Sequence, residues 1–305
     1  MSETDNFGDR LDDAISRSGS VVCVGLDPRG AQLPPTLRPK DLSDWQAVAI
    51  AYEKFCIGIV DAVKSHVGVV KPQAAFFEEL GPHGMVALGK VIEYAVSQGL
   101  IVILDGKRND IGTTAEAYAR GYLGDTSPWY CDALTVSPYL GKDSLEPFLD
   151  ICIETMSGIF VLVKTSNPGG GFLQDRLVDG QPIYRHMADL VTSLNADRLG
   201  PAGYGPVGAV VGATYPEQLR DLRAAMPTAP ILIPGFGAQG GAAQDVIGGF
   251  DANGRGAIVN SSRHIIFAYE RPEFREKFGP ANWQDAAEAA TQEMNDQLNS
   301  AIPGR

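Results

Sequence analysis

Cysteine is scarce in this chain, and the four that occur, Cys23, Cys56, Cys131 and Cys152, show no paired spacing. A disulfide framework and a cysteine-based zinc site both need such pairs, so neither is predicted. We expect all four thiols to be small buried side chains in a reducing, cytoplasmic compartment. The four histidines also lack the spacing of metal ligands, so no metal site is expected from them.

Long hydrophobic runs and an excess of positive charge are also absent. The longest apolar stretches are short segments such as 101–104, far below the length that spans a bilayer. The net charge is −12, from 25 basic and 37 acidic residues, which gives no general attraction to nucleic acid or to anionic membranes. The first ten residues are acidic and polar, unlike a signal peptide. We therefore expect no nucleic-acid partner and no membrane partner, and an anionic ligand would need a few local cations.

The chain does contain enough apolar residues for a large core, together with abundant glycine. Hydrophobic residues make up 44% of the sequence and charged residues 20%, which excludes wholesale disorder. The 35 glycines amount to about 11%, against a usual value of roughly 7%. This excess indicates tight loops and close approaches of the backbone to other groups.

Eight short apolar segments rich in β-branched residues recur along the chain, each followed by glycine or polar residues. Their continuous apolar character is typical of parallel strands that are covered on both faces. The expected strands lie within 21–28, 67–73, 101–107, 132–138, 159–166, 207–214, 229–235 and 256–262.

Segments with helical spacing of apolar residues lie between these strands. The clearest are 45–63, 85–96 and a last helix over 283–298. Asp143 and Ser144 are expected to cap a further helix. Alternation of strand and helix along the whole chain favours right-handed βαβ units in one sheet.

Eight such units in a chain of this length predict an α/β fold of the (β/α)8 TIM-barrel type. No repeat, low-complexity tract or linker divides the sequence, so we expect a single domain over 1–305. Residues 29–43 have the composition of a surface insertion after the first strand. Residues 169–181 are expected to form a long loop after the fifth.

Charged residues follow several of the expected strands, and the carboxyl ends of barrel strands converge on one face. Asp27 and Lys71 follow the first and second strands, and Asp105 and Lys107 end the third. Because Asp105 and Lys107 are two residues apart, their side chains can project to the same side of the strand. Asp110 follows at the start of the next helix. From spacing alone, a helix-capping role for Asp110 and a surface position for Lys107 stay equally open.

The loops after the seventh and eighth strands indicate a phosphate site, because barrels often bind phosphate there. The segment 234–241, PGFGAQGG, offers backbone amides, and Gln239 adds a side-chain donor. Arg263 follows the eighth strand and can direct two donors at phosphate oxygens. An ordinary glycine turn and a surface arginine are the alternatives.

The motif Asp-x-Lys-x-x-Asp-Ile-x-x-Thr over 105–114 resembles the signature of the orotidine 5′-phosphate decarboxylases, which catalyse the last step of UMP synthesis. Its neighbourhood, DGKRNDIGTTAEAYA, is similar to the type 2 branch of bacteria and archaea. Gly106 and Asn109 stand where that branch would have alanine and glycine, but the charged members of the motif are unaffected. The similarity extends over blocks at 25–29, 71–78, 136–141, 164–169, 234–241 and 260–263.

This resemblance implies a carboxy-lyase that converts orotidine 5′-phosphate to UMP without a metal, flavin or pyridoxal cofactor. Loss of carbon dioxide leaves a carbanion at C6, and Lys107 matches the residue that stabilises this charge and then protonates it. Asp105 matches a residue beside the substrate carboxylate. Two roles stay open for Asp105. It either repels that carboxylate or keeps Lys107 protonated and in position.

The same match gives the other site residues their roles. Lys71 completes the charge array and contacts the ribose, Asp27 accepts from a ribose hydroxyl, and Ser166 bonds the pyrimidine edge. Without the match, Ser166 would be interpreted as a turn residue. Asp110 and Thr114 match residues that reach into the neighbouring subunit, so the resemblance implies a cytoplasmic homodimer with shared active sites.

Two other functions remain as alternatives. A metal-dependent sugar-phosphate aldolase or decarboxylase of the same barrel superfamily would need a carboxylate at the end of the second strand, where this chain has Lys71. A catalytically silent barrel that only binds nucleotides is disfavoured by the presence of Asp105, Lys107 and Asp110.

Overall fold

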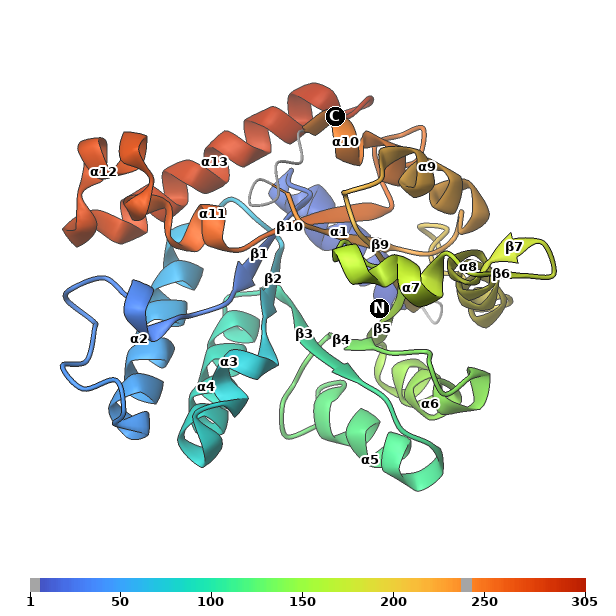
Figure 1. The fold of residues 1–305 in the computed structure, drawn as a ribbon, viewed down its shortest axis with the longest axis horizontal. Helices are drawn as coiled ribbons and strands as arrows, with labels where there is room; N and C mark the ends of the chain where they lie inside the picture. The colour runs from blue at the N-terminus through green and yellow to red at the C-terminus, as the bar shows by residue number, and fades with distance from the viewer. Residues whose placement is uncertain (1–5, 237–242) are drawn as a thin grey trace.

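The computed structural model describes residues 6–236 and 243–305, and its centre is a closed barrel of eight parallel strands (Figure 1). The order around the barrel is β1-β10-β9-β8-β5-β4-β3-β2. The barrel strands are β1 (Val22–Leu26), β2 (Val69–Pro72), β3 (Ile101–Arg108), β4 (Ala133–Val136), β5 (Gly158–Lys164), β8 (Val207–Val211), β9 (Ile231–Pro234) and β10 (Ala257–Ser261). The predicted (β/α)8 barrel and its eight strands are thus confirmed, whereas a single domain over all of 1–305 stays a prediction.

Helices surround this barrel and cover the outer faces of its strands (Figure 1). The strands are buried along nearly their whole length, which explains why their sequences are continuously apolar. The main helices are α2 (Trp45–Val63), α3 (Ala74–Glu78), α4 (Gly81–Ser97), α5 (Gly112–Tyr122), α6 (Glu146–Thr155), α8 (Ile183–Asn195), α9 (Pro216–Ala225), α12 (Pro272–Phe278) and α13 (Trp283–Ala301). The helices predicted at 45–63, 85–96 and 283–298 are all present.

An amino-terminal helix that the sequence did not predict, α1 (Phe7–Ser18), lies across the ends where the strands begin. Its Phe7 ring packs edge-on against Phe160, with ring centroids 5.9 Å apart. Arg10 forms an ion pair with the buried Asp132, immediately before β4. The opposite end of the barrel, where the strands finish, therefore holds the open mouth.

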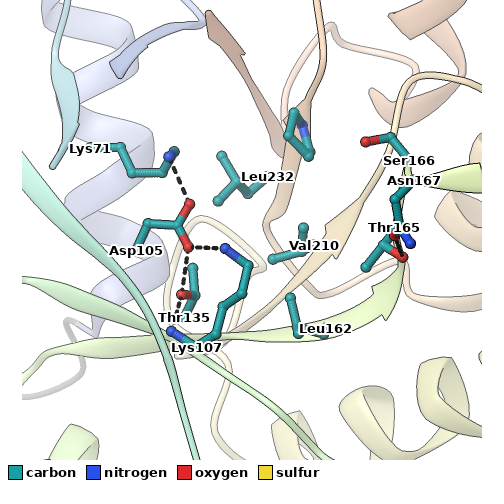
Figure 2. Close-up of a pocket in the computed structure, with 11 residues that line it drawn as sticks. Lys71, Asp105, Lys107, Thr135, Leu162, Thr165, Ser166, Asn167, Val210 and Leu232 are labelled. Carbon is teal, nitrogen blue, oxygen red and sulfur yellow. Dashed lines mark hydrogen bonds and ion pairs between the residues drawn. The ribbon is translucent and has the colours of Figure 1, made fainter. Parts of the chain in front are cut away.

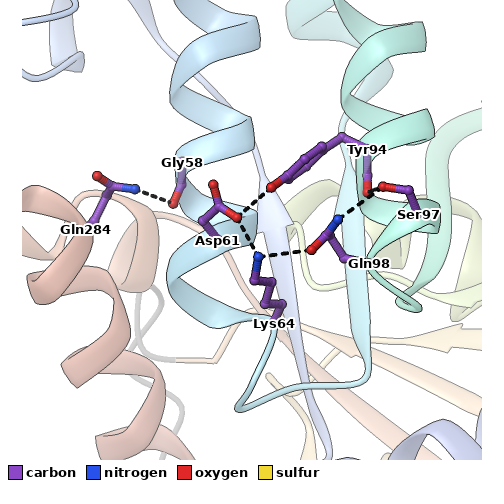
Figure 3. A network of polar contacts seen from close by, with 7 residues as sticks. All are labelled: Gly58, Asp61, Lys64, Tyr94, Ser97, Gln98 and Gln284. Atoms are coloured by element: carbon purple, nitrogen blue, oxygen red, sulfur yellow. Dashed lines mark hydrogen bonds and ion pairs between the residues drawn. The ribbon is translucent and has the colours of Figure 1, made fainter.

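Polar contacts also join neighbouring helices on the outside (Figure 3). Asp61 of α2 accepts from Lys64 at 2.7 Å and from Tyr94 of α4 at 2.6 Å. Gln284 of α13 donates to the carbonyl of Gly58 in α2 at 3.1 Å. These bonds link α4, α2 and α13 beside one another around the barrel.

Two local predictions need correction. Asp143 and Ser144 do not cap α6: they belong to a short 3-10 turn (Lys142–Ser144), and the Ser144 hydroxyl donates back to Gly141 at 2.6 Å. The expected loop at 169–181 contains a short helix, α7 (Gly171–Gln174), and most of a small hairpin of β6 (Leu177–Val178) and β7 (Gln181–Pro182). Both strands of the hairpin lie at the surface, so they lack the apolar pattern of the barrel strands.

All four cysteines are buried, as predicted, and all four are free. Within the described ranges, no helix is long and apolar enough to cross a bilayer.

Candidate active site

A cavity of about 240 Å³ opens at the carboxyl ends of the strands (Figure 2). One wall is charged, the opposite wall carries small polar side chains, and apolar residues lie between them. The lining residues are Lys71, Asp105, Lys107 and Thr135 on the charged side, Thr165, Ser166 and Asn167 on the polar side, and Leu162, Val210 and Leu232 between. Pro234 also lines the cavity.

Three of the predicted charged residues meet on one wall of this cavity. The Lys71 ammonium lies 2.8 Å from Oδ2 of Asp105, and the Lys107 ammonium lies 2.6 Å from Oδ1 of the same carboxylate. The side chains of Lys71 and Asp105 are 4% and 11% exposed, whereas that of Lys107 is 48% exposed. Lys107 is thus the cation of this array that reaches the open part of the cavity.

The surroundings keep Asp105 and Lys71 charged. Burial alone would raise the pKa of Asp105, but the ammonium groups of Lys71 and Lys107 outweigh it and hold that pKa well below its usual range. Burial would lower the pKa of Lys71, but the charges of Asp105 and Asp27 outweigh it and raise that pKa above its usual value. At neutral pH the wall therefore carries an anion bonded to the buried Lys71 cation.

Thr135, on β4, connects Asp105 and Lys107 of this wall. Its hydroxyl accepts the backbone N–H of Lys107 at 2.9 Å and donates to Oδ1 of Asp105 at 2.9 Å. Lys107 has a φ of 46°, in the left-handed region that residues with a β-carbon rarely adopt. Thr135 was not predicted from the sequence. The feature that could have indicated it is a hydroxyl residue within the otherwise apolar stretch 133–136.

Asp27 follows β1 and lies close enough to Lys71 to influence its pKa. One carboxylate oxygen, Oδ1, is buried and has no hydrogen-bond partner among the described residues. A buried acceptor without a partner fits a ligand hydroxyl, as the resemblance predicted.

The predicted phosphate residues are placed only in part. Arg263 begins the short helix α11 (Arg263–Ile266) directly after β10, and its side chain is exposed. Gln239 lies outside the described residues, as does most of the segment 234–241.

Asp110 and Thr114 do not line the cavity of their own chain. Among the residues that the structure describes, the Asp110 carboxylate accepts only the N–H of Ile111, at 2.8 Å, and Thr114 is exposed in the first turn of α5. The N-cap position of α5 is Ile111, without a side-chain hydrogen bond, so Asp110 does not cap this helix.

The donor set of the cavity does not suit a divalent cation. Both oxygens of Asp105 bond to ammonium groups, and Lys71 occupies the strand end where the metal-dependent alternative needs a carboxylate. In the part of the chain that the structure describes, no cluster of three His, Cys, Asp or Glu side chains could hold a metal.

Comparisons with known proteins agree with this geometry. The model of the orotidine 5′-phosphate decarboxylase / HUMPS family matches residues 20–277. The orotidine 5′-phosphate decarboxylase of Rhodopirellula baltica is 63% identical over 297 residues, covering 96% of this chain and 98% of the relative. That of Haloarcula marismortui is 44% identical over 296 residues, covering 96% and 99%.

Solved structures give the same result. A putative orotidine 5′-phosphate decarboxylase from Streptomyces avermitilis superposes with a TM-score of 0.80 at 36% identity, covering 98% of this chain and 96% of that one. The orotidine 5′-phosphate decarboxylase of Leishmania donovani superposes with a TM-score of 0.76 at 32% identity, covering 97% and 98%. With these relatives, its barrel and its charged wall, the chain belongs to the orotidine 5′-phosphate decarboxylase / HUMPS family.

Proposed function

We propose that this chain decarboxylates orotidine 5′-phosphate to UMP, the last step of UMP synthesis. The observation that carries this proposal is the Lys107 ammonium, which reaches the cavity while Asp105 holds it at 2.6 Å. A pyrimidine lying between the charged wall and the polar wall would bring its C6 carboxylate to this pair.

The reaction then needs one cation and one proton at C6. When the bond from C6 to the carboxylate breaks, carbon dioxide leaves and the electron pair stays on C6. The Lys107 ammonium stabilises this charge and transfers a proton to C6, which leaves a neutral amine that regains its proton from solvent. Because Asp105 and Thr135 fix Lys107 before substrate arrives, little reorganisation is required at the moment of reaction.

The remaining predicted residues would orient the substrate. Ser166 would bond the pyrimidine edge from the polar wall, and Asp27 would accept from a ribose hydroxyl. Gln239 and Arg263 would hold the phosphate beyond the cavity. Binding energy from the phosphate, far from C6, can then position the base.

A homodimer with shared active sites completes the proposal. Asp110 and Thr114 lie outside the cavity of their own chain, which leaves them available to that of a partner. Ile111, Tyr139 and Leu140, at the same end of the barrel, are 57%, 76% and 44% exposed, and apolar side chains gathered at a surface often mark an interface. We place this dimer in the cytoplasm, with no nucleic-acid or membrane partner.

An assay with orotidine 5′-phosphate in the presence of EDTA tests the function. We expect the orotidylate absorbance to fall at the same rate with and without EDTA, because no step of the proposed mechanism depends on a metal. Inactivation by EDTA that a divalent cation reverses would instead support the metal-dependent alternative. Nucleotide binding without any loss of absorbance would support the silent barrel.

A further inference from the structure

Lys164, the last residue of β5, is a buried cation that the proposed mechanism does not use. The residue is only 2% exposed, and it does not line the cavity. Its ammonium lies 5.2 Å and 5.3 Å from the ring centroids of Tyr184 and Tyr215, and it forms an ion pair with Asp175. A buried ammonium is costly unless it is paired, so Asp175, which directly follows α7, is tied firmly to the end of β5.

Thr165 and Gln174 make a second connection between the same two segments. Gln174 accepts the backbone N–H of Thr165 at 3.1 Å and donates to the Thr165 hydroxyl at 2.8 Å. Lys164 and Thr165 at one end, and Gln174 and Asp175 at the other, therefore close the intervening segment into a loop. We refer to these four residues as the clasp.

The loop that the clasp closes carries the polar wall of the cavity. Ser166 and Asn167 follow the clasp directly and line the cavity (Figure 2). Asn167 accepts from the Thr165 hydroxyl at 2.6 Å. On its other side Ser166 lies against Gly212, where a β-carbon would come within 2.9 Å of the Ser166 backbone nitrogen.

The end of β5 is irregular where the clasp begins. Its pairing with β8 shifts between Leu162 and Lys164, so Leu162 faces the cavity while Lys164 points outward to the helices. Such an irregularity redirects the side chains that follow it. The position of Ser166 is therefore set by the strand end, by Gly212 and by the clasp together.

We propose that Lys164 is a positioning residue for recognition of the base: its ion pair with Asp175 closes the loop so that Ser166 presents its hydroxyl to the pyrimidine. This inference rests on the proposed function. Lys164 acts through the loop and touches no substrate atom. Losing the clasp should impair binding of the base but not of the ribose phosphate.

The test compares UMP with ribose 5-phosphate, which lacks the base. The double variant Lys164→Met/Asp175→Asn removes the clasp charges without leaving an unpaired buried one. We expect UMP to bind roughly tenfold more weakly and ribose 5-phosphate to change by less than about twofold. The value of kcat/KM for orotidine 5′-phosphate should fall with UMP affinity.

Matched variants separate this effect from general damage. Lys90→Met/Glu53→Gln removes a surface ion pair of 3.0 Å elsewhere, and it should leave both affinities unchanged. Gln174→Ala loosens the same loop without altering a charge, and it should reproduce the selective loss even where the double variant folds poorly. Thermal unfolding establishes which variants are folded.

Two results would overturn the inference. One is UMP affinity within about twofold of the wild type in folded variants that lack the clasp. The other is equal weakening of UMP and ribose 5-phosphate, which would mean that the clasp supports the whole barrel mouth. A wild-type protein that bound UMP but left orotidine 5′-phosphate intact would refute the proposed function instead.

Discussion

Two neighbours that are bonded to each other hold Lys107. Asp105 binds its ammonium, and Thr135, which also donates to Asp105, accepts its backbone N–H. Both bonds therefore restrict the position of the ammonium that we propose as the proton donor. We expect Lys107→Ala to lower kcat by several orders of magnitude, because the variant lacks both the cation and the proton donor. UMP should still bind, since these interactions are largely absent with product.

Absorbance assays and UMP calorimetry on the same preparation measure both properties of this variant. A Lys107→Ala enzyme with nearly normal kcat would remove Lys107 from the mechanism.

Thr135→Val tests the link between Asp105 and Lys107, because it keeps the shape of the side chain but deletes the hydroxyl. The Lys107 N–H would lose its partner, and we expect kcat to fall between about tenfold and a hundredfold, with a smaller change in KM. Thr135→Ser retains the hydroxyl and should keep most of the activity. Equal kcat in Thr135→Val and the wild type would show that this link is dispensable.

Asp105 should make stability depend on pH. Burial raises its pKa, but Lys71 and Lys107 lower it further, so the folded state holds the anion more strongly than the unfolded chain does. This stabilisation is complete above the ordinary pKa of about 4 and is lost as the pH falls toward the lower pKa of the folded state. In Asp105→Asn, Lys71 stays buried without its ion-pair partner, and we expect a loss of about 3–5 kcal/mol at pH 7.

Urea unfolding at pH 7 and pH 3 measures this difference between the wild type and Asp105→Asn. The difference in the free energy of unfolding between the two proteins should be smaller at pH 3 than at pH 7. A difference that does not change with pH would argue against an ion pair between Asp105 and the lysines.

At the scale of elements, the barrel strands were predictable because burial on both faces leaves a continuous apolar signature. Helix α1 was missed because it begins within the acidic and polar first ten residues of the chain, although Phe7, Leu11 and Ile15 lie one turn apart on its buried face. The charged residues of the wall were predictable because they lie at the ends of two such strands, Lys71 on β2 and Asp105 and Lys107 on β3. Thr135 was not, because its partners come from another strand and only the folded barrel brings them together.

The short helix α11 begins at Arg263, so the phosphate prediction concerns this element. We expect Arg263→Ala to weaken binding of UMP and to lower kcat/KM for orotidine 5′-phosphate. Orotidine, which lacks the phosphate, should be a very poor substrate, and the substitution should affect it little. Equal losses for both substrates would exclude Arg263 as the phosphate ligand.

At the scale of the whole molecule, the shared-site dimer can be tested by complementation. Lys107→Ala and Asp110→Ala homodimers should each be nearly inactive. In a mixed dimer one site carries both lesions and the other carries neither. Random exchange makes about half of the dimers mixed, so activity should rise toward about a quarter of the wild-type value.

Mass spectrometry of the mixture should confirm that subunits have exchanged. Exchange without any recovery of activity would mean that Asp110 acts within its own subunit or that the dimer is arranged differently.

The left-handed backbone conformation at Lys107 favours glycine, whereas the proposed reaction requires a lysine there. Glycine adopts this conformation without a steric cost, whereas any residue with a β-carbon is disfavoured there. A Lys107→Gly protein should therefore be inactive yet unfold at a higher temperature than Lys107→Ala. Glycine would relieve the backbone strain at this position but could supply neither a cation nor a proton, so the strain is retained together with the role that we propose for the lysine.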